Sequence, residues 1–137
     1  MAAVAENASE RLALQWFENL SAGDFDALRA MLHPDATWTL QVSGVQGAGS
    51  VYKGTKAIID EFLMPVRLGL FETGDPKMLI DNVLSKGSLV CVECRGIGRM
   101  KSGGEYRNKY CWLVEIKDEK VFAIREYMDS YYVSTLK

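Results

Sequence analysis

The amino-acid sequence predicts an α+β domain in which a cone-shaped, curved antiparallel sheet wraps around about three N-terminal helices. Two observations support this fold class. In the first half, apolar residues recur every three or four positions, which is the spacing of amphipathic helices. The second half holds four strand-like segments separated by short turns, and helices followed by such strands are typical of a sheet packed on a helical layer. The 137 residues show no internal repeat or linker, so we expect one domain over residues 1–137.

Two helices are expected near the N-terminus. From Ser9 to Leu20 the apolar residues form one stripe, and the segment around Gly23 stops the helix. Asp24 is a good N-cap for a second, short helix. That helix is expected to end at His33, because the proline that follows disfavours helix in the residue before it. Its buried face would hold Phe25, Leu28 and Leu32.

The middle of the chain is expected to hold a strand, a loop and a third helix. The alternating segment Thr37–Val42 predicts the strand, and the glycine-rich residues 44–49 predict a flexible loop. The third helix is expected to start near Gly54 and to end near Pro65. Its buried side would be formed by Ile58, Ile59, Phe62 and Leu63.

Four strands in the second half would form the meander. The breaks between them fall at Gly87, at residues 102–104 and at residues 117–119, and their lengths suit hairpin loops. The expected strands are Met78–Leu84, Ser88–Met100, Tyr106–Ile116 and Val121–Tyr131.

Composition argues against several classes of partner. The net charge is −2 with both signs interspersed, which favours neither nucleic acid nor an anionic membrane surface. No apolar run approaches the roughly 20 residues that a membrane-spanning helix needs. The first seven residues are too short and too polar for a secretory signal, so the expected location is the cytoplasm.

The three cysteines predict neither a disulfide framework nor a metal centre. An odd count argues against disulfides. Cys91 and Cys94 have the spacing of half a zinc site, but no second pair follows, and a separation of three places them on opposite faces of a strand. We therefore expect buried structural thiols, no metal and no organic cofactor.

The last predicted strand carries the most informative residue, Glu126. Alternation places it on an apolar face, which it shares with Phe122, Ile124 and Met128. A carboxyl in such a place has to be paired, or its pKa rises through desolvation. A raised carboxyl pKa suits general acid–base chemistry near neutral pH; the alternative is a buried glutamate tied structurally to an arginine.

The long strand Ser88–Met100 offers a charged pair. Glu93 and Arg95 lie side by side on one face of it, opposite to Val90 and Val92. An arginine beside a carboxylate can orient a base or stabilise a developing oxyanion. An ion pair on the outer face of the sheet is the alternative, and the sequence leaves the choice open.

Aromatic residues could line a pocket for a small apolar molecule. Asn108, Tyr110 and Trp112 share one face of their strand, and this pattern suits a pocket with a few oriented polar groups or an ordinary core. The same two readings apply to the remaining candidates, which are Trp16, Trp38, Phe62 and Met128.

The stretches Ala22–Leu28, His33–Trp38, Tyr52–Ile58 and Lys120–Asp129 carry a family resemblance. The first three resemble the opening and the third helix of the nuclear transport factor 2-like (NTF2-like) superfamily. The last is similar to the final strand of SnoaL-like polyketide cyclases and limonene epoxide hydrolases. The resemblance covers most of the chain and implies the cone-shaped, cystatin-like fold. That fold hosts isomerases, cyclases, dehydratases, hydrolases and inert binding modules, so it implies no single activity.

Two enzyme templates within this superfamily imply residue roles. The catalytic positions of ketosteroid isomerases correspond here to Trp16, Leu40 and approximately Tyr110, so their base is missing and that chemistry is not expected in its usual form. The water-activating aspartate of limonene epoxide hydrolases corresponds to Glu126. Their neighbouring arginine and aspartic acid fall near the charged pair of the long strand, with the order reversed.

We therefore expect an acid–base enzyme, an isomerase, cyclase or epoxide-hydrolase-like protein, that acts on a hydrophobic terpenoid- or polyketide-like molecule. Glu126 would be the base, Arg95 would orient it or stabilise charge, and Glu93 would be the acid. Tyr110 and Asn108 would position the substrate. The alternative is a non-catalytic module that binds a ligand or a protein. The resemblance also implies a homodimer formed through the outer face of the sheet.

Overall fold

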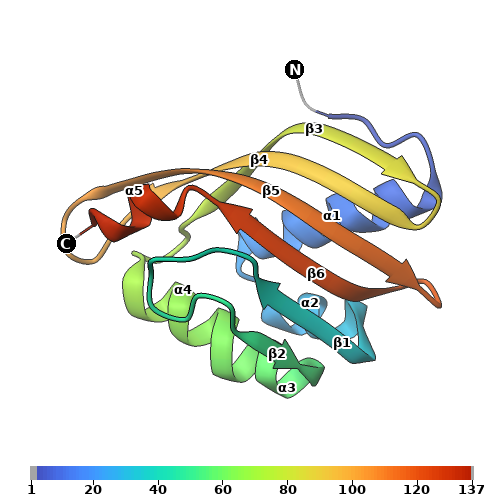
Figure 1. Ribbon diagram of the computed structural model, residues 1–137, viewed down its shortest axis with the longest axis horizontal. Helices are drawn as coiled ribbons and strands as arrows, with labels where there is room; N and C mark the ends of the chain where they lie inside the picture. The colour runs from blue at the N-terminus through green and yellow to red at the C-terminus, as the bar shows by residue number, and fades with distance from the viewer. Residues whose placement is uncertain (1–2, 137) are drawn as a thin grey trace.

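The computed structural model describes residues 3–136 as a curved six-stranded sheet with helices packed on its inner face (Figure 1). The strand order is β2-β1-β6-β5-β4-β3. The strands are β1 (Leu32–Leu40), β2 (Val51–Lys53), β3 (Lys77–Lys86), β4 (Leu89–Arg99), β5 (Glu105–Lys117) and β6 (Lys120–Met128). The helices are α1 (Ala8–Ala22), α2 (Phe25–Met31), α3 (Gly54–Ile58), η1 (Ile59–Leu63), α4 (Met64–Leu70) and α5 (Ser130–Ser134).

The predicted meander of four strands is confirmed, but the sheet as a whole is mixed. Strands β3 to β6 pair antiparallel with their neighbours in sequence, whereas β1 pairs parallel with β6. The prediction of an antiparallel sheet is wrong at this one junction. The chain crosses from β1 to the far edge of the sheet through α3, η1 and α4, so the last strand returns to lie beside the first (Figure 1).

The first helix follows the prediction closely. The side chain of Asn7 accepts a hydrogen bond from the Glu10 backbone N–H and caps the start of α1, while Gly23 ends it with φ of 68°. This left-handed conformation favours glycine at a helix end. The buried residues Ala13, Trp16 and Phe17 face the sheet, because α1 packs against β3, β4 and β5.

The third helix is longer than predicted and continues through Pro65. Its middle, η1, is a π-helix, and the following residues continue as α4 to Leu70. Pro65 falls in the first turn of α4, directly after the π-helical residues Ile59–Leu63. The continuation past the proline brings Arg67 to the inside of the protein, where it is 8% exposed.

Three shorter differences concern the ends of elements. Leu32 begins β1 rather than lying in the second helix, and a short edge strand, β2, precedes α3. The last strand ends at Met128, because the Asp129 side chain accepts a hydrogen bond from Tyr132 N and caps α5.

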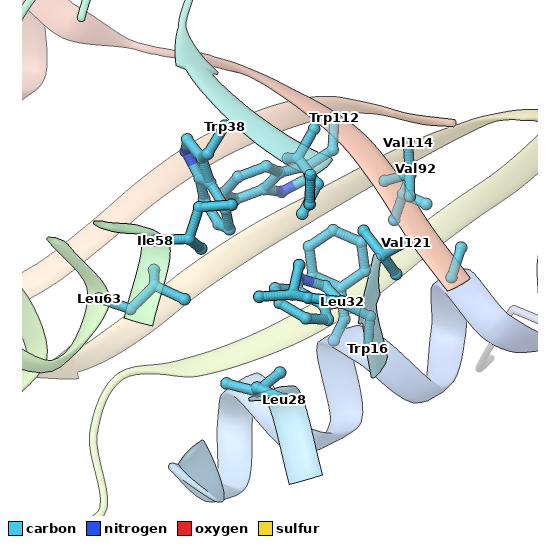
Figure 2. Close-up of a cluster of buried hydrophobic side chains, with 14 of the residues drawn as sticks. Trp16, Leu28, Leu32, Trp38, Ile58, Leu63, Val92, Trp112, Val114 and Val121 are labelled. Carbon is cyan, nitrogen blue, oxygen red and sulfur yellow. The ribbon is translucent and has the colours of Figure 1, made fainter. Parts of the chain in front are cut away.

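A large hydrophobic core fills the space between the helices and the inner face of the sheet (Figure 2), and a smaller cluster is formed by Phe71, Met100 and Tyr106. Trp112 packs against two other aromatic rings of the large core, and its ring centroid lies 5.2 Å from that of Phe17 and 5.3 Å from that of Trp38. Contacts of this kind hold the large side chains of several elements in fixed orientations. The labelled members of the core in Figure 2 are Trp16, Leu28, Leu32, Trp38, Ile58, Leu63, Val92, Trp112, Val114 and Val121.

Candidate active site

A cavity of about 600 Å³ lies beside the core, between the inner face of the sheet and the helices η1, α4 and α5. Its size is within the range of small-molecule sites. Most of its wall is apolar or aromatic, and few of the lining residues carry charge. The sequence-predicted residues on this wall are Trp38, Phe62, Tyr110, Trp112, Glu126 and Met128.

Glu126 is the buried carboxyl of this cavity. It is 7% exposed, and its Oε1 accepts a hydrogen bond of 2.9 Å from Trp38 Nε1. No lysine, arginine or histidine among residues 3–136 forms an ion pair with it. Burial raises the pKa of Glu126 to about 7, and the bond from Trp38 opposes the rise because it favours the carboxylate. The apolar surroundings and raised pKa that strand alternation predicted are both present.

The parallel pairing of β1 with β6 brings Trp38 to Glu126. In this register Trp38 lies opposite Ile124 and Leu40 lies opposite Glu126, so the two side chains of the bond point to the same face. Phe62 packs edge-on against the Trp38 indole at 5.4 Å, which helps to hold the donor in place.

Two tyrosines form a second polar group in the cavity. The hydroxyls of Tyr106 and Tyr110 share a short hydrogen bond, and Asn108 Nδ2 donates to the Tyr106 oxygen at 2.9 Å. The Tyr110 ring stacks on Trp112 at 5.0 Å. Burial raises the pKa of both phenols, so both remain protonated at neutral pH.

The tyrosine pair has one hydroxyl proton to spare. Of its two O–H groups, one donates in the bond between the rings, and Asn108 occupies a further acceptor site on Tyr106. The other proton has no protein acceptor within the described part of the chain. Because both rings line the cavity, this proton can be donated to an oxygen of a bound molecule.

Two of the predicted pocket residues lie elsewhere. Asn108 is 2% exposed and supports Tyr106 without lining the cavity. Trp16 is fully buried in the core at 6.3 Å from Trp38, because its position on α1 faces the sheet. The prediction that Trp16 contacts substrate is therefore corrected. Its Nε1 is buried and has no hydrogen-bond partner among the described residues.

Glu93 and Arg95 do not join Glu126. They lie on the outer face of β4, where Arg95 pairs with Asp81 at 2.9 Å and Glu93 accepts a hydrogen bond from Asn82 at 2.7 Å. Alternation along β4 turns Val90, Val92 and Cys94 inward, so their neighbours must face outward. The prediction that this pair acts on the substrate of Glu126 is corrected.

The cavity residues that were not predicted as site residues include Arg67 and Tyr106. Tyr106 continues the alternation that had already grouped Asn108 with Tyr110, and this signal could have identified it. Arg67 follows Leu63 by four residues, which is the spacing of the buried stripe. The expected end of the helix at Pro65 concealed that position.

The cysteines are free thiols. Cys94 is buried and accepts a hydrogen bond from Trp112 Nε1 at 3.0 Å, as expected for a structural thiol. Cys91 and Cys111 lie on the outer face with their sulfur atoms 3.5 Å apart, and Cys91 is only partly buried, so the expectation of a buried thiol is wrong for Cys91. Within residues 3–136, no three metal-binding side chains come together, and no helix is long and apolar enough to cross a membrane.

A curved sheet whose helices and inner face enclose a cavity with a buried carboxyl places the chain in the NTF2-like class of α+β proteins. Its fold matches an NTF2-like protein of unknown function from Burkholderia pseudomallei K96243, with a TM-score of 0.80, 15% identity, and coverage of 93% of this chain and 95% of that one. The chain belongs to the SnoaL-like domain family, whose model matches residues 13–124.

Two further solved structures are similar. A candidate SnoaL-like polyketide cyclase from Jannaschia sp. CCS1 has a TM-score of 0.77 and 19% identity, over 95% of this chain and 94% of that one. TerC, co-crystallised with polyporic acid, has a TM-score of 0.78 and 18% identity, over 93% of this chain and 95% of that one. At these identities the likeness shows the fold alone. No curated protein matches the chain.

Proposed function

We propose that the protein is an acid–base enzyme that removes a carbon-bound proton next to a carbonyl group in a hydrophobic, polyketide- or terpenoid-like molecule. The observation that carries the proposal is Glu126, a carboxyl with a pKa of about 7 on the wall of an apolar cavity. A base with its pKa near the operating pH combines a useful ionised fraction with a strong drive for proton transfer.

The tyrosine pair supplies the second part of the proposed chemistry. When Glu126 takes the proton, the electron pair of the broken C–H bond moves into the carbonyl, and negative charge develops on its oxygen. The spare hydroxyl proton of Tyr106 and Tyr110 is available to stabilise that oxygen. The enolate then takes the proton from Glu126 at another carbon, which isomerises the molecule. Alternatively, it attacks a second carbonyl carbon, which closes a ring, and the oxygen of that carbonyl takes the proton from Glu126.

Ring closure of this kind is supported by the family and by one of its neighbours. The chain has a SnoaL-like domain, and the similar Jannaschia protein is named after polyketide cyclases. The epoxide-hydrolase template is supported less well. Its arginine–acid pair corresponds to Arg95 and Glu93, which lie on the outer face of the sheet and do not line the cavity.

Hydrogen–deuterium exchange tests the proposal without knowledge of the substrate. 2-Tetralone is a hydrophobic bicyclic ketone with acidic α-hydrogens, and their replacement by deuterium can be followed by NMR. The wild-type protein is expected to accelerate exchange, and Glu126→Gln is expected to reduce the rate by about 100-fold or more. Glu93→Gln is the matched control, because this carboxyl lies on the other face of the sheet and should leave the rate unchanged.

The same experiment separates the enzyme from the non-catalytic alternative. If ketones of this class bind, as shown by quenching of tryptophan fluorescence, but exchange is not accelerated, the binding module is favoured. Exchange that persists at the wild-type rate in Glu126→Gln would contradict the assignment of Glu126 as base.

We also propose a homodimer formed through the outer face of the sheet. The exposed fractions of Leu79 and Tyr127 on this face are 40% and 39%, which is high for large apolar side chains. Light scattering at micromolar concentration should give a mass of about twice 15.3 kDa. Leu79→Asp should shift the protein to the monomer, and a wild-type monomer would contradict the proposal.

A further inference from the structure

Arg67 places a permanent positive charge on the wall of the cavity. It lies on α4, is 8% exposed, and is among the residues that line the cavity. Buried charges in proteins are normally paired or fully hydrogen-bonded, because desolvation of an isolated ion is costly. The contacts of this guanidinium therefore show whether its charge is already compensated within the protein.

Backbone carbonyls take part of its hydrogen-bonding capacity. Nη1 donates to the carbonyl oxygens of Leu20 at 2.7 Å and Pro76 at 3.2 Å, and Nη2 donates to that of Ser21 at 2.8 Å. Leu20 and Ser21 lie in the last turn of α1, and the Leu20 carbonyl also accepts a hydrogen bond from Gly23 N at 3.1 Å, so the guanidinium adds to the capping of this helix end. These three bonds explain how Arg67 joins α4 to the end of α1 and to the start of β3.

The charge itself has no carboxylate partner. No aspartate or glutamate among residues 3–136 lies within 4.0 Å of Arg67. The charge of Asp75 acts on it from farther away, but Asp75 Oδ2 already accepts a hydrogen bond from Arg99 N. Of the five guanidinium N–H groups, three make the bonds described above, which leaves two for another acceptor.

Glu126 does not supply this acceptor. The two side chains form no ion pair, and the raised pKa of Glu126 follows from burial with a single opposing bond, from Trp38. The carboxyl on β6 and the cation on α4 are therefore separate groups on the cavity wall. Glu61, the other acidic residue on the wall, is exposed and forms no ion pair with Arg67, so the guanidinium has no carboxylate partner among the described residues in either protonation state of Glu126.

We propose that the ligand of this cavity carries an anionic group, a carboxylate or an ionised enol or phenol, that binds the Arg67 guanidinium. The hydrophobic part of such a ligand lies along the aromatic wall, and its reactive carbon lies at Glu126. The inference adds a substrate class to the proposed function and rests on it only for the placement of the reactive carbon. An arginine is suited to this role because it can bind a carboxylate through two parallel hydrogen bonds.

Matched pairs of small aromatic ligands test the inference by tryptophan quenching, since Trp38 and Trp112 line the cavity. One pair is 2-naphthoate and 2-naphthamide, and the other is 2-hydroxy-1,4-naphthoquinone and its 2-methoxy analogue. In each pair the first member is ionised at pH 7 and the second is neutral and of similar shape. Wild-type protein should bind the anion of at least one pair about 10-fold more tightly or better.

Arg67→Gln should abolish this preference and leave binding of the neutral partner largely unchanged. The control is Arg29→Gln, which removes an exposed arginine that pairs with Asp60 on the surface and should retain the preference. Circular dichroism checks the fold of both variants. If Arg67→Gln does not fold, the comparison between the anion and its neutral partner in the wild type still tests whether the cavity prefers an anionic ligand.

Equal affinities in both pairs, or no binding of any anion, would overturn the inference, as would a preference that survives in a folded Arg67→Gln protein. Failure of the proposed function is measured separately. An anion preference retained in Glu126→Gln, together with no ketone exchange in the wild type, would support the ligand class and contradict the catalytic role.

Discussion

Trp38 Nε1 donates to Glu126 Oε1 at 2.9 Å, and the bond joins residues 88 positions apart in the chain. Its donor is the one side-chain group in the described structure that favours the charged form of this carboxyl. Desolvation and this bond act in opposite directions on the pKa of Glu126, and desolvation is the larger effect. The effect of the bond on this pKa can be tested by a substitution at position 38 that removes the N–H donor and keeps an aromatic ring.

Trp38→Phe should raise the pKa of Glu126 further. A hydrogen bond to a charged group contributes about 1.5–3 kcal/mol, so the pH midpoint of ketone exchange should move upward by roughly one to two units. The measurement is the rate of 2-tetralone exchange from pH 5 to pH 10. Trp16→Phe is the matched control, because it removes a neighbouring indole N–H that has no partner among the described residues. A midpoint that stays near pH 7 in Trp38→Phe would contradict the role of the bond.

Glu126 should also make stability depend on pH. Its pKa is about 7 in the folded protein and near 4.5 in the unfolded chain, so the folded state holds the extra proton between these values. Stability associated with this group is therefore fully present below pH 4.5 and is lost as the pH rises through 7. The loss is at most about 3 kcal/mol. Urea denaturation of wild type and Glu126→Gln at pH 5 and pH 8.5 measures it, and the variant should gain relative to the wild type at the higher pH.

The tyrosine pair should affect the rate of exchange more than binding. Tyr110→Phe removes a hydroxyl from the hydrogen-bonded chain and is expected to lower ketone exchange by about 100-fold, the size of the effect of losing an oxyanion donor. Tyr127→Phe changes a hydroxyl on the outer face of the sheet and serves as the control. If Tyr110→Phe and Tyr106→Phe both kept the wild-type rate, the tyrosines would be structural.

Gly96 leaves room for the ring of Tyr110. A Cβ at position 96 would lie 2.8 Å from Tyr110 Cε1, so Gly96→Ala must move the ring away from its stack on Trp112. Overpacking of this kind costs about 1–3 kcal/mol in stability, and a displaced donor should also slow exchange. In Gly104→Ala the added Cβ meets no atom within 4 Å, so this variant controls for the loss of a glycine. Thermal denaturation and the exchange assay measure the two effects.

Strand alternation predicted more of the site than helix periodicity did. It placed Glu126 on the inner face with Met128, and it grouped Asn108 with Tyr110 and Trp112, because side chains in a strand have only two directions to choose from. It did not show which face of β4 is inward for Glu93 and Arg95. The inward face of β4 is the one that α1 covers, and the sequence of β4 alone does not show where α1 packs.

The remaining part of the site depends on contacts between distant segments. Nothing local in β1 indicates that it pairs with β6, so the partner of Glu126 was not predicted. Arg67 was missed for a different reason, because a π-helical turn carries the helix through Pro65 and shifts which side chains face inward. Local rules describe helices and strands well, but long-range pairing and helix irregularities decide which polar groups meet.

The position of β6 has a consequence for how the protein is made. The last of these six strands to be synthesised occupies the interior of the sheet, between β1 and β5 (Figure 1). Until it is synthesised, both neighbours expose unpaired backbone edges, and such edges are prone to association with other chains. Nascent chains that stop before residue 120 should therefore aggregate or recruit chaperones. The same strand carries Glu126, so a chain acquires its candidate catalytic carboxyl only in the step that closes its sheet.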